Sequence, residues 1–309
     1  MSWAVRIKLG ALVCTATLLG SCSLLFSADD TGSEVNDDAG GRIDAATIDA
    51  GPVFDGPPPD AALPLATNRL ILRYFLDDDP GEDVVSDINE ELVNDLELAN
   101  GLQVTGTEGR RGLRWETVND VGVAETRLES GHALLALQEA LTFTFEFVLR
   151  VDDAGSQSPS ILFLLSTDGA GEGDAALQLR NPDDGGFVVD FVFDGIVIRS
   201  WPAPNLGERS VLHFVFDSPA STEINRLRLY SNGLPLSADK EFISLAEDAR
   251  FKFDIDSLFA LGNAESPESR SLSGKIFYLA VYDAALPETV MTSQSAILIS
   301  NDDQPPPMP

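Results

Sequence analysis

The stretch TFTFEFVLRV, Thr142–Val151, alternates apolar and polar side chains along its length. Phenylalanine, leucine and valine occupy every second position, and threonine, glutamate and arginine occupy most of the others. Successive side chains of a β-strand point to opposite faces of the sheet, so a period of two predicts a strand with one face in the core and one toward solvent. The stretch therefore indicates half-buried strands in an antiparallel sheet.

The same alternation appears in GFVVDFVF, residues 186–193, and in SVLHFVFD, residues 210–217. Shorter strands are predicted at RLILRYFL, GLRWETV, GVAETRL, SILFLLST, AALQLR and IVIRSW, with Gly, Asp, Asn and Pro between them. Short strands at even spacing are typical of a sandwich or a barrel. Helix is expected only around HALLALQEA, residues 132–140, and LPETVMTSQSA, residues 286–296. The pattern predicts an all-β domain with one or two short helices.

Near the end of the chain, LSGKIFYLAVYDAAL, Leu272–Leu286, predicts one long strand through Ile276, Leu279 and Val281. Gly274 permits a sharp entry or a β-bulge at the start of this strand. We expect this strand to be the last long one of the sandwich.

Composition supports a folded domain and excludes one class of partner. The 309 residues are 44% hydrophobic and include 17 Phe, which is enough apolar surface for a core despite a formal charge of -30. With 20 basic residues against 50 acidic ones, phosphate would repel the chain, and no Lys/Arg cluster is evident along the sequence. A nucleic-acid partner is therefore not expected.

The first 22 residues, MSWAVRIKLGALVCTATLLGSC, have two positive charges, an apolar run and a small-residue end, as a secretory signal does. Leu19–Cys22 resembles the lipobox of bacterial lipoproteins, which implies a signal peptide over residues 1–21 and a diacylglycerol on Cys22. The residues after Cys22 lack the aspartate that retains such proteins at the inner membrane, so an outer-membrane lipoprotein is expected. A plain signal peptide cut nearby is the alternative.

Residues 22–68 are predicted to be an acidic linker rich in Asp, Ala, Gly and Pro. Its part from residue 27 onward has nine acidic residues and one Arg, and like charges with a triple proline keep such a chain extended. One domain is expected over 69–300, followed by a Pro-rich tail over 301–309. Before residue 69 lie nine of the 50 acidic and three of the 20 basic residues, so the remaining 41 acidic and 17 basic residues give the domain and tail a charge of -24.

The segments RLRLYSNGLPL, residues 226–236, and FALGNAESPESRSLSGKIFYLAVYDAALPETVM, residues 259–291, resemble the closing half of a laminin-G-like, concanavalin A-like jelly-roll domain. The likeness covers about residues 69–300 and is carried by Leu229, Tyr230, Asn232, Gly233, Leu261, Gly262, Asn263, Gly274, Lys275, Ile276, Tyr282, Ala285 and Leu286. The resemblance implies a two-sheet antiparallel jelly-roll sandwich, with a tight hairpin at Asn232-Gly233, where both residues tolerate positive φ. The segment Arg209–His213 departs from the family pattern, which often has Trp followed by His.

Catalysis is not expected. Concanavalin A-like folds include polysaccharide hydrolases and lyases, but a retaining glycosidase needs two carboxylates about 5 Å apart. The nearest approach to such a pair, Glu172–Asp174, continues without a second glutamate, and His132 and His213 are the only histidines. His213 alternates with apolar residues, which is typical of a sheet-face position.

Two kinds of ligand site are considered, a calcium site in an Asp/Gly-rich loop and an aromatic platform for a sugar, and each has a structural alternative. Some laminin-G-like domains place a calcium-binding Asp before the strand read here as AALQL, which corresponds to Asp174, and Asp168 lies in the same Asp/Gly-rich loop. Such a loop is also what a solvated turn looks like. Trp201 is a candidate platform for a sugar ring or a loop-packing residue, and Trp115 is expected in the core.

The sequence thus favours a surface-anchored, non-enzymatic binding or adhesion module at the cell envelope, with rim loops and a polar sheet face contacting a glycan or a protein. The alternatives are a polysaccharide-active glycoside hydrolase or lyase and a structural envelope lipoprotein. Calcium is the one cofactor considered.

Overall fold

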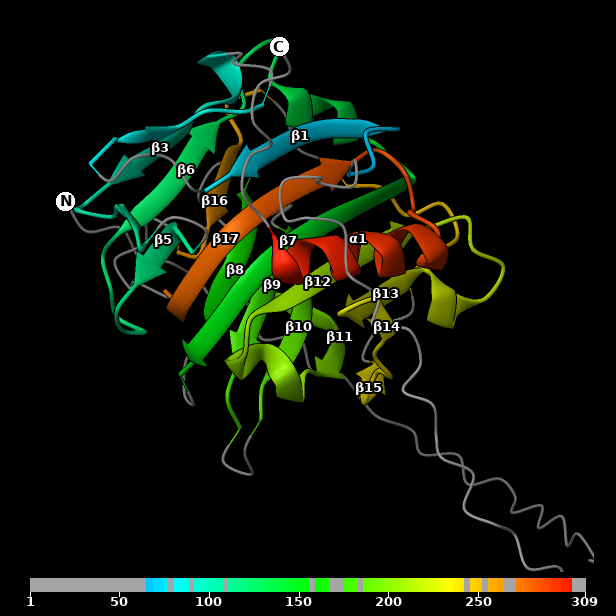
Figure 1. Cartoon of the computed structure of the whole chain (residues 1–309). Coiled ribbons are helices and arrows are strands. Elements are labelled where there is room, and N and C mark those ends of the chain that lie inside the picture. The colour runs from blue at the N-terminus through cyan, green and yellow to red at the C-terminus, as the bar shows by residue number, and fades with distance from the viewer. Residues whose placement is uncertain are drawn as a thin grey trace, which may run out of the picture. The chain divides into compact units, whose positions relative to one another are not determined.

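The computed structural model describes residues 65–76, 81–88, 92–107, 110–155, 159–166, 175–182, 186–241, 245–251, 255–263 and 271–301. These residues form two antiparallel β-sheets packed face to face, with one α-helix across the outer face of the first sheet (Figure 1). The predicted all-β sandwich is confirmed.

The first sheet has eight strands. In spatial order they are β14 (Leu234–Pro235), β13 (Leu227–Ser231), β12 (Ser210–Asp217), β7 (Thr142–Asp153), β17 (Ser273–Tyr282), β5 (Gly112–Trp115) and β4 (Val104–Thr105), with β1 (Leu70–Phe75) also paired to β17. The strands β7 and β17 are therefore central, and each pairs with a neighbouring strand along both of its edges.

The second sheet has nine strands. In spatial order they are β15 (Lys240–Glu241), β11 (Ile196–Pro202), β10 (Val188–Phe193), β9 (Ala175–Arg180), β8 (Ser160–Ser166), β16 (Leu258–Leu261), β6 (Val123–Arg127), β3 (Leu96–Ala99) and β2 (Val84–Val85). Some strands that pair in this sheet are far apart in sequence, such as β16 and β6. The sheet is therefore held together by long-range pairing.

Helical structure is sparse, as predicted. The helix α1 (Glu288–Ser300) follows Pro287, whose ring suits a helix start. Four 3-10 turns are η1 (Leu92–Asn94), η2 (Ala133–Leu137), η3 (Pro204–Gly207) and η4 (Glu223–Asn225). The two segments in which helix was expected correspond to η2 and α1.

The core between the sheets follows the alternation in β7. Its odd-numbered residues from 143 to 151 all belong to this core. Phe145 of β7 stacks on Phe163 of β8 in the other sheet, with ring centroids 4.5 Å apart and planes 10° apart. Phe143 stacks on Phe216 of β12 at 4.9 Å. The Phe145–Phe163 contact joins the two layers, whereas the Phe143–Phe216 contact lies within the first sheet. Full burial of a phenylalanine side chain stabilises the fold by about 1.5–3 kcal/mol.

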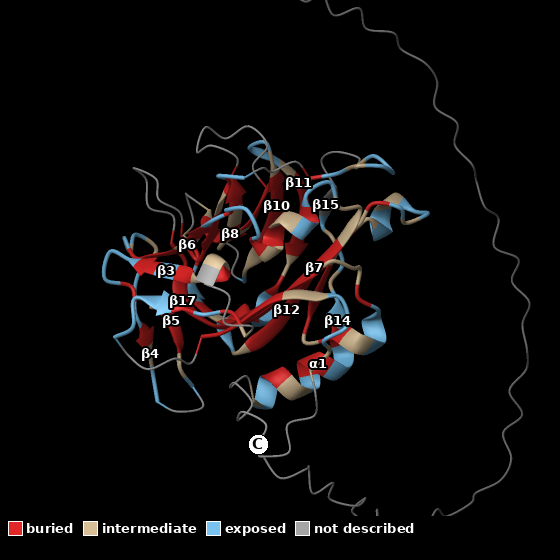
Figure 2. Cartoon of the chain, turned by 90° about the horizontal axis from the view of Figure 1, so that it is seen from above, coloured by how far each residue is buried: buried red, intermediate tan, exposed pale blue. Residues whose placement is uncertain are grey.

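The outer face of the first sheet differs from the sequence-based prediction of half-buried strands. Thr144, Glu146 and Val148, on the outward side of β7, are fully buried. The helix α1 lies across this face and presents Met291 and Leu298 to it, which makes a second, smaller core (Figure 2). The prediction was wrong because alternation within a strand cannot show that a distant helix covers its polar side.

The predicted hairpin is confirmed: Asn232 and Gly233 have φ values of 52° and 77° and join β13 to β14. The predicted last long strand is β17, and its pairing with β7 shifts register at Gly274 as expected. A second shift, at Phe277, leaves that residue opposite no partner on β7.

The Leu261-Gly262-Asn263 segment, which carries part of the family resemblance, packs against the buried indole of Trp115. The Trp115 indole is fully buried and its Nε1 donates to the Gly122 carbonyl oxygen at 2.9 Å. Asn263 Nδ2 donates to the same oxygen at 2.9 Å. Gly262 has φ 70°, and a Cβ placed there would lie 2.3 Å from the indole. The glycine is therefore required by both conformation and space.

Gly262→Ala should lower the free energy of unfolding by about 2–4 kcal/mol, because it combines overpacking with an unfavourable positive φ. Gly195→Ala is a matched control, since Gly195 has φ 72° and nothing within 4 Å of the added Cβ. It should cost about 1 kcal/mol. Urea unfolding followed by tryptophan fluorescence measures both, and equal losses in the two variants would contradict the role given to the indole.

Candidate ligand-binding site

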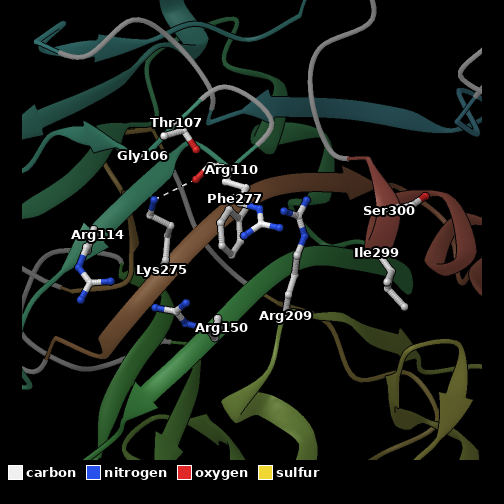
Figure 3. A pocket seen from close by; sticks show the side chains of 10 residues that line it. All are labelled: Gly106, Thr107, Arg110, Arg114, Arg150, Arg209, Lys275, Phe277, Ile299 and Ser300. Carbon is white, nitrogen blue, oxygen red and sulfur yellow. Dashed lines mark hydrogen bonds between the residues drawn. The ribbon is translucent and has the colours of Figure 1, made fainter. Parts of the chain in front are cut away.

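A pocket of about 660 Å³ opens on the outer face of the first sheet, beside the end of α1 (Figure 3). Its walls come from the β4–β5 connection, β5, β7, the residue before β12, β17 and the last turn of α1. We call it the basic pocket, after the side chains of Arg110, Arg114, Arg150, Arg209 and Lys275 that line it around Phe277.

The basic pocket brings together positively charged side chains from several parts of the sequence. Five of the chain's 20 basic residues line it, and none of the described lining residues carries a carboxylate. The expectation that no Lys/Arg cluster acts locally was therefore wrong. Arg110 and Arg114 are close in sequence, but Arg150, Arg209 and Lys275 join them only when the sheet forms.

The bulge in β17 supplies the aromatic wall. Ile276 and Leu279 point into the core between the sheets, whereas Phe277 and Tyr278 both belong to the outer-face core. The register shift at Phe277 puts two successive side chains on one face, which a regular strand cannot do. The Arg209 guanidinium lies over the Phe277 ring, 4.6 Å from its centroid. This cation–π contact orients Arg209 within the pocket.

Lys275 lies deeper than the arginines. Its side chain is 8% exposed, and Nζ donates to the carbonyl oxygens of Thr105 and Arg110, the latter at 3.0 Å. These two carbonyl groups hold the ammonium in place. Lys275 therefore ties the β4–β5 connection to β17.

Two of the arginines have carboxylate partners outside the pocket lining. Arg114 pairs with Glu116 at 2.8 Å and with Asp152 at 3.8 Å, and Arg150 pairs with Asp152 at 3.0 Å. The hydrogen bond to Glu116 raises the pKa of Arg114 and lowers that of the carboxyl.

A buried polar cluster lies beneath α1 on the same face. The Glu146 carboxylate is fully buried. Its Oε1 accepts hydrogen bonds from Tyr278 at 3.0 Å and Tyr282 at 3.2 Å. Its Oε2 lies 2.8 Å from His213 Nε2 and accepts from Gln294 Nε2. Burial first, and then the Glu146 carboxylate, raises the pKa of both tyrosines, so both hydroxyls stay protonated as donors. This cluster joins β7, β12, β17 and α1.

Of the residues predicted to bind a ligand, Trp201 is in the core. It is 1% exposed and meets Phe214 edge-on, with centroids 6.4 Å apart. The platform role is therefore corrected to core packing, because its strand turns the ring inward. Asp168, Asp174 and the lipid-attachment residue Cys22 lie outside the described residues. In the described part of the chain, no group of three or more His, Cys, Asp or Glu is placed to hold a metal ion.

The two histidines are both buried, and their contacts indicate structural roles. His213 contacts Glu146 through Nε2, and within the described residues its Nδ1 has no hydrogen-bond partner. His132 is 2% exposed, and its Nδ1 accepts from the Leu134 backbone at the start of η2. Neither histidine lines the basic pocket.

Comparisons with known proteins show the fold class. No family model matches the chain, and no curated protein matches it. A Trypanosoma rangeli sialidase in complex with sialic acid is 17% identical, with a TM-score of 0.52 over 75% of this chain and 34% of that one. The binding domain of botulinum neurotoxin DC, in complex with rat synaptotagmin II, is 10% identical, with a TM-score of 0.52 over 75% of this chain and 52% of that one.

The chain therefore spans about a third of the sialidase and about half of the neurotoxin chain that it matches. At these identities the likeness establishes a β-sandwich and nothing more specific. Among the residues that the structure describes, no helix has the length and apolar character needed to cross a membrane.

Glu146→Leu should lower the free energy of unfolding by about 3–5 kcal/mol, because four buried polar groups would lose their shared partner. Asp152→Leu removes a carboxylate from the same strand that is 39% exposed, and should cost less than about 1 kcal/mol. Urea unfolding at neutral pH compares them. Equal stability of the two variants would refute the account of the Glu146 cluster.

Burial lowers the pKa of His132 from 6.5 to about 4. The unfolded chain therefore binds a proton near pH 6.5 that the folded chain does not bind until about pH 4. The free energy of unfolding should fall by about 3 kcal/mol through this group as the pH drops across that window. His132→Asn keeps a side-chain acceptor at the cap and removes the titration, so its pH profile should be flatter. Identical profiles would contradict this assignment.

Proposed function

We propose that the chain is a surface-anchored, non-enzymatic binding or adhesion module that recognises a glycan or a protein at the cell envelope through the basic pocket. The observation that carries this proposal is the pocket itself. Its volume of about 660 Å³ lies in the range of small-molecule sites, and central strands of a sheet position several of its side chains. Side chains that a rigid scaffold already holds in place lose less conformational entropy when a ligand binds.

The proposed membrane anchor and linker are inferred from the sequence. Lipid on Cys22 would hold the chain in the outer membrane, and the acidic linker over residues 22–68 would keep the domain away from the surface. We assign the domain to the laminin-G-like class. The Asn232-Gly233 hairpin and the packing of Gly262 against Trp115 support this assignment. A calcium ion at Asp174 stays a prediction.

The composition of the pocket supports binding over hydrolysis. Glycoside hydrolysis needs two carboxyl groups on either side of the scissile bond, one to donate a proton and one to stabilise or activate. The described lining of the basic pocket has neither a carboxylate nor a histidine. Guanidinium groups do not exchange protons near neutral pH, so these side chains suit recognition of charge.

The full chain should bind a subset of immobilised envelope glycans or envelope proteins saturably and release no product from them. Arg209→Glu reverses a charge inside the pocket and should weaken binding at least about ten-fold. Arg127→Glu makes the same charge change on β6 of the other sheet and should leave binding unchanged. Glycan-array and surface-binding measurements test this. Absence of any partner, or steady release of shortened glycan, would overturn the proposal.

A further inference from the structure

We propose that the end of the linker, the strand β1 and the helix α1 form a mechanical clamp, which carries tension between the membrane anchor and a ligand bound on the first sheet. This inference rests on the proposed function, because a surface-anchored adhesion module is pulled at both ends. Three features of the molecule support it: the contacts of the last linker residues, the way β1 is held, and the position of the basic pocket along β17.

The last residues of the predicted linker are fastened to buried side chains of the domain. The Ala66 amide donates to Gln294 Oε1 of α1 at 2.7 Å, and the Ala66 carbonyl oxygen accepts from Arg73 Nη2 of β1 at 2.8 Å. Gln294 and Arg73 are 2% and 4% exposed. Gln294 Nε2 in turn donates to the Glu146 carboxylate. A pull transmitted along the backbone to Ala66 is therefore shared among α1, β1 and, through Glu146, β7.

Apolar contacts and a turn strengthen this attachment. Leu65 and Leu70 both pack against the outer-face core. In the turn between them, the Leu70 amide donates to the Thr67 carbonyl oxygen at 3.2 Å, and Arg69 has φ 66°. The Arg69 carbonyl oxygen accepts from the Asp283 amide at 3.0 Å, and Arg69 Nη2 donates to the Asp283 carbonyl oxygen at 3.1 Å. The backbone is thus fixed to the end of β17 before β1 begins.

The strand β1 is hydrogen-bonded along both edges. On one edge it pairs antiparallel with β17, where Phe75 lies opposite Tyr278. On the other edge the Arg73 amide donates to Asp87 Oδ1 at 3.0 Å, and the Arg73 carbonyl oxygen accepts from the Ile88 amide at 3.1 Å. Extraction of β1 therefore breaks a ladder on one side and further backbone contacts on the other.

The position of the basic pocket sets the direction of the tension on β1. The strand β1 starts opposite Tyr282, at the end of β17, whereas Lys275 and Phe277 of the pocket lie near the start of β17. At about 3.3 Å per residue, Lys275 and Tyr282 are about 20 Å apart along the strand. The two strands lie side by side (Figure 1), so tension between linker and ligand pulls them past each other along their length. In this shear geometry the hydrogen bonds of the ladder share the force.

Constant-force measurements on single molecules of the full, unlipidated chain test this inference. Cys14→Ser leaves Cys22 as one handle, and Thr107→Cys at the pocket supplies the other. A second molecule combines Cys22 with Glu288→Cys, shortly after the end of β17. Thr107 and Glu288 are both exposed. The first geometry shears β1 against β17, and the second peels β1 from the Tyr282 end, one bond at a time. Unfolding should be at least about ten-fold slower in the first geometry at equal force.

Two variants test the attachment contacts in the shear geometry. Ala66→Pro removes the amide that donates to Gln294 and should speed unfolding at constant force by about two- to ten-fold. Arg69→Asn places a residue that tolerates positive φ and removes the guanidinium, and should speed unfolding by about two-fold. The Arg69 side chain is 58% exposed, so this variant keeps the fold even if the first does not. Arg127→Asn, on β6 of the other sheet, is the matched control and should leave the rate unchanged.

A third geometry separates a role in carrying tension from general stability. Handles at Thr107→Cys and Ile196→Cys, with Cys14→Ser and Cys22→Ser, pull on the domain without passing through the linker. In this geometry the two attachment variants should unfold at the rate of the parent. Equal acceleration by these variants in the shear and third geometries would overturn the clamp. Equal rates in the shear and peeling geometries would overturn it as well.

Binding measurements separate this inference from the proposed function. A chain that binds an envelope partner but unfolds at one rate in the shear and peeling geometries refutes the clamp and leaves the proposed function in place. A chain that shows the expected rates but binds no envelope glycan or protein removes the proposed function, and with it the tension that the clamp is proposed to carry.

Discussion

The two-residue repeat of β7 is the constraint on which the rest of the structure depends. Its phenylalanines must lie between the sheets, and this places Thr144, Glu146, Val148 and Arg150 together on the opposite face. A slip of one residue would exchange the two sets. The aromatic core, the cluster under α1 and one wall of the basic pocket are therefore consequences of a single strand register.

Irregularity in the neighbouring strand converts this regular face into a site. The bulge at Phe277 adds a residue to β17, so that Phe277 and Tyr278 both lie on the outer face, and Phe277 lies beside Lys275. Bulges often re-aim side chains next to functional sites. The helix α1 covers the part of the face around Glu146 and ends at the pocket, where Ile299 and Ser300 complete the lining. The covered part stabilises the sheet, and the uncovered part is the basic pocket.

The fold could be predicted from the sequence because its strands carry local signals. Alternation in Thr142–Val151, the Asn232-Gly233 turn and the strand ending near Tyr282 all correspond to observed elements. The spacing of three between Ile276 and Leu279, where a regular strand has two or four, was a signal of the bulge at Phe277. Burial of the outer face could not be predicted, because the contacts with α1 join residues far apart in the chain.

The site was missed for a related reason. Arg150, Arg209 and Lys275 occur far from one another in the sequence, among an excess of acidic residues, and only the arginines of GRRGLRW, residues 109–115, were a local basic signal. Only strand pairing brings them together. Trp201, which looked like a sugar platform beside Pro202, is in the core because its position in β11 faces the other sheet. Residue type alone does not determine which side of a strand meets the ligand.

The most direct test of the account is a two-dimensional NMR titration of the arginine Nε–Hε signals with an envelope glycan that the full chain binds. The account predicts saturable shifts of the Arg110, Arg150 and Arg209 signals with one common dissociation constant, while the Arg127 signal stays in place. Shifts of equal size at all of these arginines, or none at the three pocket residues at saturating sugar, would contradict it.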